Sequence, residues 1–426
     1  MKIKLMIVTI NSWRDENSIG NTFSNWLAGM TDIDISNVFM REENPNNNVC
    51  SNYFRITEKM LIKNFFHPKR IGQRLITKNE FSENSQSISD ENKMKRIISK
   101  HNYTIFYMLK DFLWSIGLWK NEKFKEFIKN NNPNIIFSFA MSGAQYYHML
   151  KFLKKQTNSK IVLYISDNVY GKFNNKNKGI YNKICDRRFK KLLQLADKVY
   201  GTSKELSDVY SKEFDIDITP LYKGAAIDSS VKRYVNKPIK MVYAGNLLYG
   251  RLETLIELSN AINKINIDET KCELFIYSVS DISKNQLDIF KANKGCYFMG
   301  GKPYEEIKKI IKSSDIVLHV ESFNQDEIEK VKFSFSTKII DCLQSESVLL
   351  AIGPKGISSI EYIRNIEGAT VIDDLEEIES KLFGLLKDSN DIIRNANKIK
   401  KFAYEHHDIE QVQNGLFKDF STLVNK

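Results

Sequence analysis

The stretch YAGNLLYGRLETLIELS, residues 243–259, decides the fold class of the chain. Its start overlaps an apolar run at 240–245 that is typical of a buried strand. A short glycine-bearing loop follows, and a helical pattern begins near Arg251. A continuous apolar strand followed by a helix is the repeating unit of a parallel sheet that is covered on both faces.

The same alternation runs through the whole chain and predicts an α/β protein. In the first half we expect strands near 3–10, 33–39, 134–139, 160–166 and 197–202, and helices at 20–29, 93–112, 121–130, 143–155, 178–195 and 203–213. In the second half we expect further strands at 272–278, 296–299, 315–320, 348–352 and 369–373, and helices at 251–265, 283–292, 303–313, 336–346, 356–365, 374–388 and 408–424. Both halves therefore resemble doubly wound sheets.

A chain of 426 residues is too long for one ordinary core, so we expect two domains. The break falls at 224–238, which is small, polar and without periodicity, and it separates an N-terminal domain, 1–223, from a second domain, 239–407. Residues 80–97 are polar and predict a mobile loop. Because ligands of such sheets bind outside the carboxyl ends of the strands, a nucleotide site in a cleft between the domains is expected.

Composition favours an acidic partner without choosing one. The net charge is +11, which suits nucleic acid, anionic lipid or phosphorylated small molecules. The charge is spread along the chain without a basic-aromatic RNA motif, so nucleic acid is the least favoured of the three. No apolar run reaches the length of a membrane span, the five cysteines predict reduced cytosolic thiols, and no metal-ligand spacing is present.

Two helix starts are candidate phosphate sites. Arg251 follows the glycine loop that begins at Gly245, and a helix N-terminus with an arginine favours an anion, although a plain turn with a surface arginine fits equally well. In VKFSFSTKII, residues 331–340, Ser336, Thr337 and Lys338 would offer donors. The alternative is a capped amphipathic helix, and both can hold together.

Other strand ends carry weaker signals. Gly300 and Gly301 form a turn whose backbone suits a base edge, and Gly20-Asn21-Thr22 opens a helix that is ready for an anion. Asp167 lies just past a strand and is a candidate functional carboxylate, with a turn cap as the alternative. His319 lies inside a strand and is expected to be simply packed.

The segments GNLLYGR and FSTKIIDCLQSESVLLAIGPKGISSIEYI resemble bacterial GT-B glycosyltransferases of the retaining family 4 type, which act in surface polysaccharide assembly. The likeness is strongest across 240–362. It implies two Rossmann-like domains facing a cleft, with a C-terminal helix, 408–426, crossing back to the N-terminal domain. It also implies donor binding by the second domain and acceptor binding by the first, the side of Gly20, Asn21 and Thr22.

The resemblance assigns roles residue by residue. Arg251 takes the place of the basic residue that contacts the donor diphosphate, and Asn246 stands where many relatives have an arginine. Asp341 takes the place of the second glutamate of a paired motif, which binds the ribose. The first glutamate would fall at Phe333, which cannot replace it, so Glu321 is the nearest substitute.

The remaining donor contacts also follow from the resemblance. Ser336, Thr337 and Lys338 fall where the helix start of the family meets the donor phosphates. Gly300, Gly301 and Lys302 fall at the base-binding turn.

We therefore expect a metal-independent, retaining glycosyltransferase that takes a nucleotide-sugar, UDP-sugar foremost, and a lipid-linked or growing polysaccharide acceptor. It would need no cofactor and would be cytoplasmic. Segments 53–75 and 112–119 would rest on the inner face of the plasma membrane, with a buried helical core as their alternative, and homo-oligomerisation stays open. One rival is a non-catalytic GT-B subunit that stabilises a partner transferase. The other is a sugar-nucleotide epimerase, which lacks its carboxylate and histidine set here.

Overall fold

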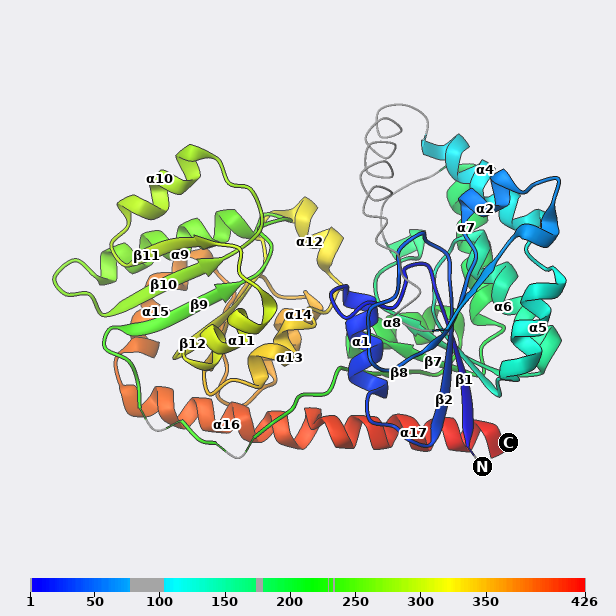
Figure 1. The fold of residues 1–426 in the computed structure, drawn as a ribbon. Coiled ribbons are helices and arrows are strands. Elements are labelled where there is room, and N and C mark those ends of the chain that lie inside the picture. The colour runs from blue at the N-terminus through cyan, green and yellow to red at the C-terminus, as the bar shows by residue number, and fades with distance from the viewer. Residues whose placement is uncertain (1, 77–102, 174–178, 229, 233, 426) are drawn as a thin grey trace. The chain divides into compact units, whose positions relative to one another are not determined.

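The computed structural model describes residues 2–76, 103–173, 179–228, 230–232 and 234–425 (Figure 1). The chain forms two compact units. The first contains Met1–Leu221 and Val412–Lys426, and the second contains Tyr222–Gln411. Each unit is an α/β layered structure, as the alternation of apolar strands and amphipathic helices predicts.

The first unit has an eight-stranded sheet in the order β4-β3-β2-β1-β5-β6-β7-β8. Its strands are β1 (Ile3–Thr9), β2 (Ile33–Phe39), β3 (Asn52–Arg55), β4 (Gln73–Leu75), β5 (Ile135–Phe139), β6 (Lys160–Ile165), β7 (Lys198–Gly201) and β8 (Ile218–Pro220). All neighbouring strands pair in parallel except β4, which runs antiparallel to β3. The central strands are apolar along their whole length because both faces are covered.

Helices cover both faces of this sheet. They are α1 (Ser18–Leu27), α2 (Glu58–Lys63), α4 (Tyr103–Ile116), α5 (Glu122–Asn131), α6 (Ala144–Thr157), α7 (Ile180–Leu193), α8 (Lys204–Phe214) and α17 (Ile409–Asn425), with the short turns η1 (Pro68–Arg70) and η3 (Gly171–Phe173). α1 and α17 share one face, where Trp26 and Phe420 pack on Phe137 of β5. Tyr200 of β7 donates to Asp419 of α17 at 2.5 Å, so the C-terminal helix is part of the first unit's core.

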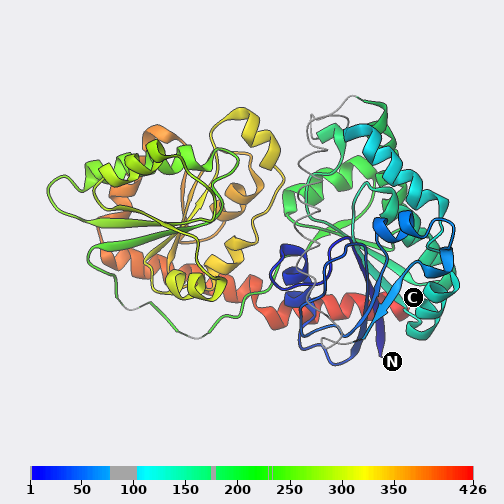
Figure 2. The ribbon, with the colours of Figure 1, turned by 45° about the horizontal axis from the view of Figure 1, so that its top comes forward.

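The second unit has a six-stranded, fully parallel sheet in the order β11-β10-β9-β12-β13-β14. Its strands are β9 (Ile239–Ala244), β10 (Cys272–Tyr277), β11 (Cys296–Gly300), β12 (Ile316–Val320), β13 (Val348–Ile352) and β14 (Thr370–Ile372). Its helices are α9 (Arg251–Ile265), α10 (Lys284–Ala292), α11 (Tyr304–Lys312), α12 (Gln325–Val331), α13 (Lys338–Leu343), α14 (Ser358–Arg364), α15 (Ile378–Leu386) and α16 (Ser389–His407), with the turn η4 (Leu375–Glu377). α9 and α15 lie on one face and α11, α13 and α16 on the other (Figures 1 and 2).

Every strand predicted in the second half is present within one or two residues, and so are the five strands predicted in the first half. Three short strands, β3, β4 and β8, were not predicted. No helix was predicted between the strand 315–320 and the helix 336–346, but this stretch contains α12, whose start Asn324 caps by accepting from two backbone N–H groups. The 19-residue helix α16 was also missed. The predicted loop 80–97 and the start of the predicted helix 93–112 lie outside the described residues.

The segment 224–238, predicted to link the domains, packs on the second unit. Buried Asp315, at the foot of β12, pairs with Lys232 at 2.9 Å and accepts from the backbone N–H of Asn236 at 3.2 Å. Asp228 accepts from Lys400 of α16 at 2.6 Å. These contacts hold the segment because a buried carboxylate is stable only when it is paired and hydrogen-bonded.

None of the described helices is both long and apolar enough to cross a membrane. The five cysteines are free, and four of them are buried.

His407, at the end of α16, is a buried histidine inside an aromatic cluster. It is 1% exposed, its Nε2 meets the hydroxyl of Tyr362, and its Nδ1 has no partner among the described residues. Tyr222 lies edge-on to its ring. Burial lowers the pKa of His407 to about 4. The neutral ring is therefore the form that the folded unit holds.

We expect the folded chain to lose stability as the pH falls from about 6.5 to about 4. In this range His407 is protonated in the unfolded chain but stays neutral in the folded chain, so acid favours unfolding. Over this window the His407 contribution is on the order of 3 kcal/mol, since one pKa unit is about 1.4 kcal/mol. Denaturant unfolding of wild type and His407→Gln at both ends of the window measures it. His406→Gln, at an exposed neighbour, is the control, and an equal pH response in all three chains would contradict the assignment.

Candidate functional site

The candidate site lies where the second sheet reverses its strand order. β9 is central, the chain moves outward through β10 and β11 on one side, and it then returns to β12 on the other. The two loops that leave the carboxyl ends of β9 and β12 therefore diverge and open a crevice, which is where parallel sheets bind ligands. The loop after β9 is 245–250, and the loop after β12 begins with Glu321.

A buried ion pair joins these two loops. Arg251, the first residue of α9, donates from Nε to Oε2 of Glu321 at 3.1 Å and from Nη2 to Oε1 at 2.9 Å. Its Nη1 donates to Oδ1 of Asn246 at 2.7 Å. The side chains of Arg251 and Glu321 are 14% and 3% exposed. The planar, two-pronged geometry fixes the guanidinium in place and balances its charge.

Glu321 is also in contact with His319, two residues earlier on the same face of β12. His319 Nε2 lies 3.3 Å from Oε1 of Glu321 and 2.9 Å from the hydroxyl of Ser359. Burial would raise the pKa of Glu321, but His319 and Arg251 outweigh it and hold that pKa below its usual value. Both oxygens of Glu321 are hydrogen-bonded to Arg251 and fix its guanidinium. That Glu321 replaces the missing donor-binding glutamate stays a prediction.

His319 is buried, in line with the prediction that it is packed, but its contact with Glu321 was not predicted. A histidine and a glutamate two residues apart on a strand point to the same face, and that spacing was the available signal.

Lys338, the first residue of α13, shares this region with Arg251. Partial burial and the positive charge of Arg251 both lower the pKa of Lys338, and Asp341 opposes the shift. Asp341 also raises the pKa of Lys223, a buried lysine whose pKa burial lowers. Lys338 is therefore close enough to both Arg251 and Asp341 to feel their charges, and Lys223 to that of Asp341.

The start of α13 differs from the predicted capped helix. α13 has six residues instead of the eleven predicted, and Thr337 occupies the N-cap position without a side-chain capping bond. The hydroxyls of Ser336 and Thr337 are half-buried, and neither has a hydrogen-bond partner among the described residues. They are therefore available to a ligand, although so short a helix contributes little dipole.

The loop 245–250 has a backbone that few other residues could form. Tyr249 and Gly250 both have positive φ, 59° and 70°. A Cβ on Gly250 would stand 2.3 Å from Oγ of Ser322, and one on Gly245 would stand 2.7 Å from the hydroxyl of Tyr243. Gly250 lets the loop after β9 approach the loop after β12 closely, which places Arg251 beside Glu321, while Gly245 makes room for the Tyr243 hydroxyl.

The turn after β11, at Gly300 and Gly301, has an open backbone. Gly300 has a φ of 70° with open space at its Cβ position, and its carbonyl accepts from Ser278 at 3.0 Å. Gly301 lies against Val279. Lys302 is exposed and pairs with Glu306 at 3.5 Å.

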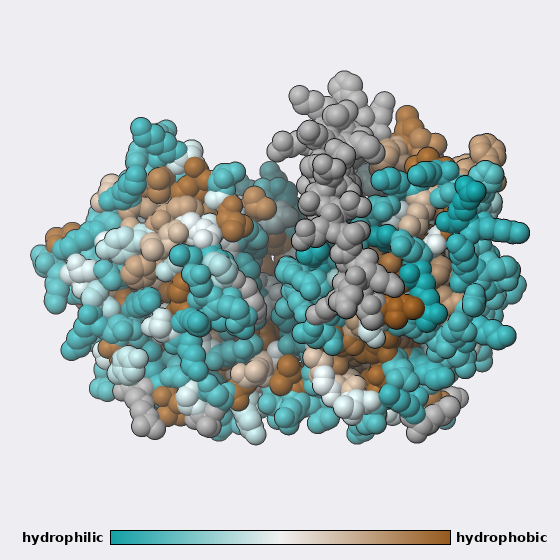
Figure 3. All heavy atoms as spheres, viewed as in Figure 1, coloured by the Kyte–Doolittle hydropathy of each residue, from teal (hydrophilic) through white to brown (hydrophobic). Residues whose placement is uncertain are grey.

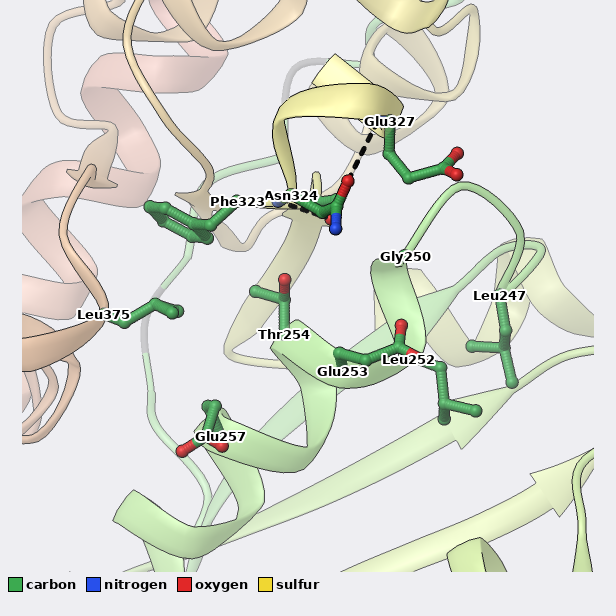
Figure 4. A pocket seen from close by; sticks show the side chains of 11 residues that line it. Leu247, Gly250, Leu252, Glu253, Thr254, Glu257, Phe323, Asn324, Glu327 and Leu375 are labelled. Carbon is green, nitrogen blue, oxygen red and sulfur yellow. Dashed lines mark hydrogen bonds between the residues drawn. The ribbon is translucent and has the colours of Figure 1, made fainter.

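A pocket lies along the first turns of α9 and the segment 322–327 (Figure 4). Figure 4 shows Thr254 between Phe323 and Asn324, with Glu257 and Leu375 at its side. Its lining residues are Leu247, Gly250, Leu252, Glu253, Thr254, Glu257, Ser322, Phe323, Asn324, Glu327 and Leu375. It contains three glutamates and neither Arg251 nor Lys338, so it does not suit a diphosphate. The described residues hold no group of side chains that could bind a metal ion.

The candidates of the first unit have mostly structural contacts. α1 begins at Ser18, two residues before the predicted start, and its cap Asn17 accepts from the N–H of Gly20 at 2.7 Å. Gly20 and Thr22 are buried, so Gly20-Asn21-Thr22 lies inside the helix and does not open it. Asp167 is exposed after β6 and accepts from the N–H of Asn168 at 2.7 Å. It belongs to a different unit from Arg251.

Comparison with solved structures places the fold. HepE from Anabaena, solved in complex with UDP, matches with a TM-score of 0.61 over 99% of this chain and 100% of that chain at 9% identity. Sucrose-phosphate synthase from Thermosynechococcus elongatus matches with a TM-score of 0.58 over 98% of each chain at 11% identity. A glycosyltransferase from Rickettsia africae matches with a TM-score of 0.59 over 99% of each chain at 12% identity.

The fold is GT-B. Two observations support this statement: the chain has two Rossmann-like sheets, and the structural matches cover nearly the full length of both chains compared. The predicted fold class is confirmed. No protein-family model matches the sequence, and no curated relative matches it. At 9–12% identity the likeness extends to the fold alone.

We expect Glu321→Gln to lower the free energy of unfolding by about 3 kcal/mol, because it leaves Arg251 buried without its counter-charge. Glu379→Gln is the matched control, since it removes an exposed pair with Lys264 that is worth at most about 1 kcal/mol. Denaturant unfolding of both variants decides between them. Similar losses of unfolding free energy in the two variants would show that the buried Arg251–Glu321 pair stabilises the protein no more than an exposed pair does.

We expect Gly250→Ala to be more destabilising than Gly356→Ala by about 1–3 kcal/mol. Both glycines have positive φ, but a Cβ at Gly356 meets open space, whereas one at Gly250 meets Ser322. Thermal unfolding of the two variants measures the difference. Equal losses would mean that the two loops are free to move apart.

Proposed function

We propose that the chain is a retaining glycosyltransferase that moves a sugar from a nucleotide diphosphate sugar, a UDP-sugar foremost, to a saccharide or lipid-linked acceptor. The observation that carries the proposal is the pair of cations, Arg251 and Lys338, at the switch point of the second sheet. This observation supports the proposal because two cations at the carboxyl edge of a parallel sheet in a GT-B fold suit the diphosphate of a nucleotide-sugar. HepE, which shares the fold, was solved with UDP.

The proposed chemistry rests on charge and position. Arg251 uses three of its five N–H groups on Glu321 and Asn246, and the other two, on Nη1 and Nη2, have no partner among the described side chains. They would donate to the diphosphate while Glu321 holds the guanidinium still. Lys338 would add the mobile charge, and Ser336 and Thr337 would add hydroxyls. Negative charge that builds on the leaving phosphate would then be stabilised without a metal.

The rest of the donor would follow the strand ends of the same sheet. We place the base at Gly300, Gly301 and Lys302 and the ribose at Asp341. The acceptor would belong to the first unit, where Asp167 is exposed at the carboxyl end of β6.

The second candidate function is a non-catalytic GT-B subunit that binds and stabilises a partner transferase. Two observations favour it: Phe333 stands where a donor-binding carboxylate is expected, and Glu321 is fully engaged with Arg251. In that function neither residue would contact the donor sugar.

Calorimetric titration with UDP, GDP and dTDP tests the proposal. We expect UDP to bind, and Arg251→Ala or Lys338→Ala to weaken binding about 10- to 100-fold, because a charge-assisted hydrogen bond is worth roughly 1.5–3 kcal/mol. Lys387→Ala, at an exposed lysine of α15's C-cap, is the control and should bind as wild type.

Slow hydrolysis of the UDP-sugar by the purified chain separates the two functions. Hydrolysis that falls in the Arg251→Ala variant supports the transferase. Nucleotide binding without turnover of any donor supports the subunit, and no binding of any nucleotide excludes the transferase.

A further inference from the structure

The first unit displays an apolar helix face that its own core leaves uncovered. On α4, Ile105, Met108, Leu109, Phe112 and Ile116 recur at helical spacing and are 58%, 47%, 59%, 61% and 39% exposed. We call these five residues the α4 face. Figure 3 shows brown and tan side chains gathered over α4 at the top of the first unit. A row of large exposed apolar residues of this length marks an interaction surface.

The opposite side of α4 is firmly docked, so the α4 face is exposed in a folded helix. Asp111 is buried, pairs with Arg188 at 2.7 Å and accepts from the N–H that opens α6 at 3.3 Å. Trp114 is fully buried and donates to Glu58 of α2 at 3.1 Å. Tyr107 stacks on Tyr181 of α7, with ring centroids 6.3 Å apart.

A strongly basic segment adjoins the α4 face. Residues 59–74, from α2 to β4, contain five exposed cations and no carboxylate: Lys59, Lys63, Lys69, Arg70 and Arg74. None of the five forms an ion pair with a carboxylate of the described residues. We call this stretch the basic segment. It also exposes Ile62 and Phe66 at 62% and 87%.

The two features lie side by side. Glu58, the first residue of α2, forms a 2.9 Å ion pair with Lys110 of α4, and α2 runs along α4 in both ribbon views (Figures 1 and 2). Apolar side chains bordered by lysine and arginine are the pattern of a surface that enters the headgroup region of a membrane.

We propose that the α4 face and the basic segment bind the surface of an anionic lipid bilayer. Leu109 and Phe112 would enter the boundary between headgroups and acyl chains, and the unpaired cations would lie against lipid phosphates. A protein partner suits this surface less well, because lysine is depleted at the centre of protein interfaces. The proposal is independent of the donor site, because every residue involved belongs to the first unit.

Flotation of the full chain with lipid vesicles tests the proposal. We expect binding to vesicles of equal parts phosphatidylcholine and phosphatidylglycerol, weak binding to phosphatidylcholine alone, and release as salt is raised. Leu109→Gln with Phe112→Gln should weaken the partition at least about tenfold, since two buried apolar side chains are lost. Ile267→Gln, at a residue of the second unit that is 70% exposed, is the control.

A second variant tests the charge separately. Lys63→Gln with Lys69→Gln should reduce binding to anionic vesicles and flatten its salt dependence, whereas Lys284→Gln with Lys387→Gln, at exposed lysines of the second unit, should not. UDP binding in solution should be the same in these two double variants and their two controls as in the wild type. A failure of the membrane proposal is therefore distinguishable from a failure of the transferase proposal.

Three outcomes would overturn the proposal. The first is a wild-type chain that does not bind anionic vesicles, which excludes a membrane-binding surface. Wild-type binding by the Leu109→Gln, Phe112→Gln variant places the contact elsewhere. The third is a wild-type chain that does not bind lipid but forms a dimer in analytical ultracentrifugation, where the Leu109→Gln, Phe112→Gln variant is a monomer. That result assigns the α4 face to a second copy of the chain.

Discussion

The ion pair between Arg251 and Glu321 is the constraint on which the second unit's site depends. Two charges that are this deeply buried are stable only when their geometry is nearly ideal and every lone pair is satisfied. Glu321 meets that demand through Arg251 and His319, while its backbone carbonyl accepts from Thr254 at 3.0 Å and its N–H donates to Ile352 at 2.8 Å. Through its side chain and its backbone together, this one residue joins β12, β13 and α9.

The pair also sets the charge that a ligand would meet. Around the crevice, Arg251, Lys338 and Lys223 carry three positive charges, and Glu321 and Asp341 carry two negative ones. The net charge of these five side chains is therefore +1, in a region that is partly shielded from solvent. Such a site attracts a phosphate group without holding it as firmly as unpaired arginines would.

Much of the fold follows from local pattern. Strands such as β13 are continuous apolar runs with no competing interpretation, and α9 matched its predicted bounds because its periodicity is strong. α16 was missed because several residues on its buried face are small or charged, Ala396, Lys400 and Ala403 among them, and so give a weak signal. α12 was missed because Gln325–Val331 is mostly polar and depends on the Asn324 cap.

The site was harder to predict for a different reason. Arg251, Lys338 and Asp341 were predicted from position and resemblance, but the partner of Arg251 was not, because an ion pair between residues 70 positions apart has no local signature. Glu321 was assigned to the donor on sequence grounds, and its contact with Arg251 could be seen only in the structure. Gly20, by contrast, was predicted as a helix start and proved to be a packing position beneath the backbone of Arg14.

The placement of α17 has a consequence for how the chain is made. Leu416 and Phe420 complete a core whose other members, such as Phe23, Phe137 and Tyr200, leave the ribosome more than two hundred residues earlier. The second unit has all of its core residues between 222 and 411, so it can finish first. Until α17 is made, the part of the N-terminal sheet that it covers would stay exposed, and a nascent chain with exposed apolar surface is open to chaperones and aggregation.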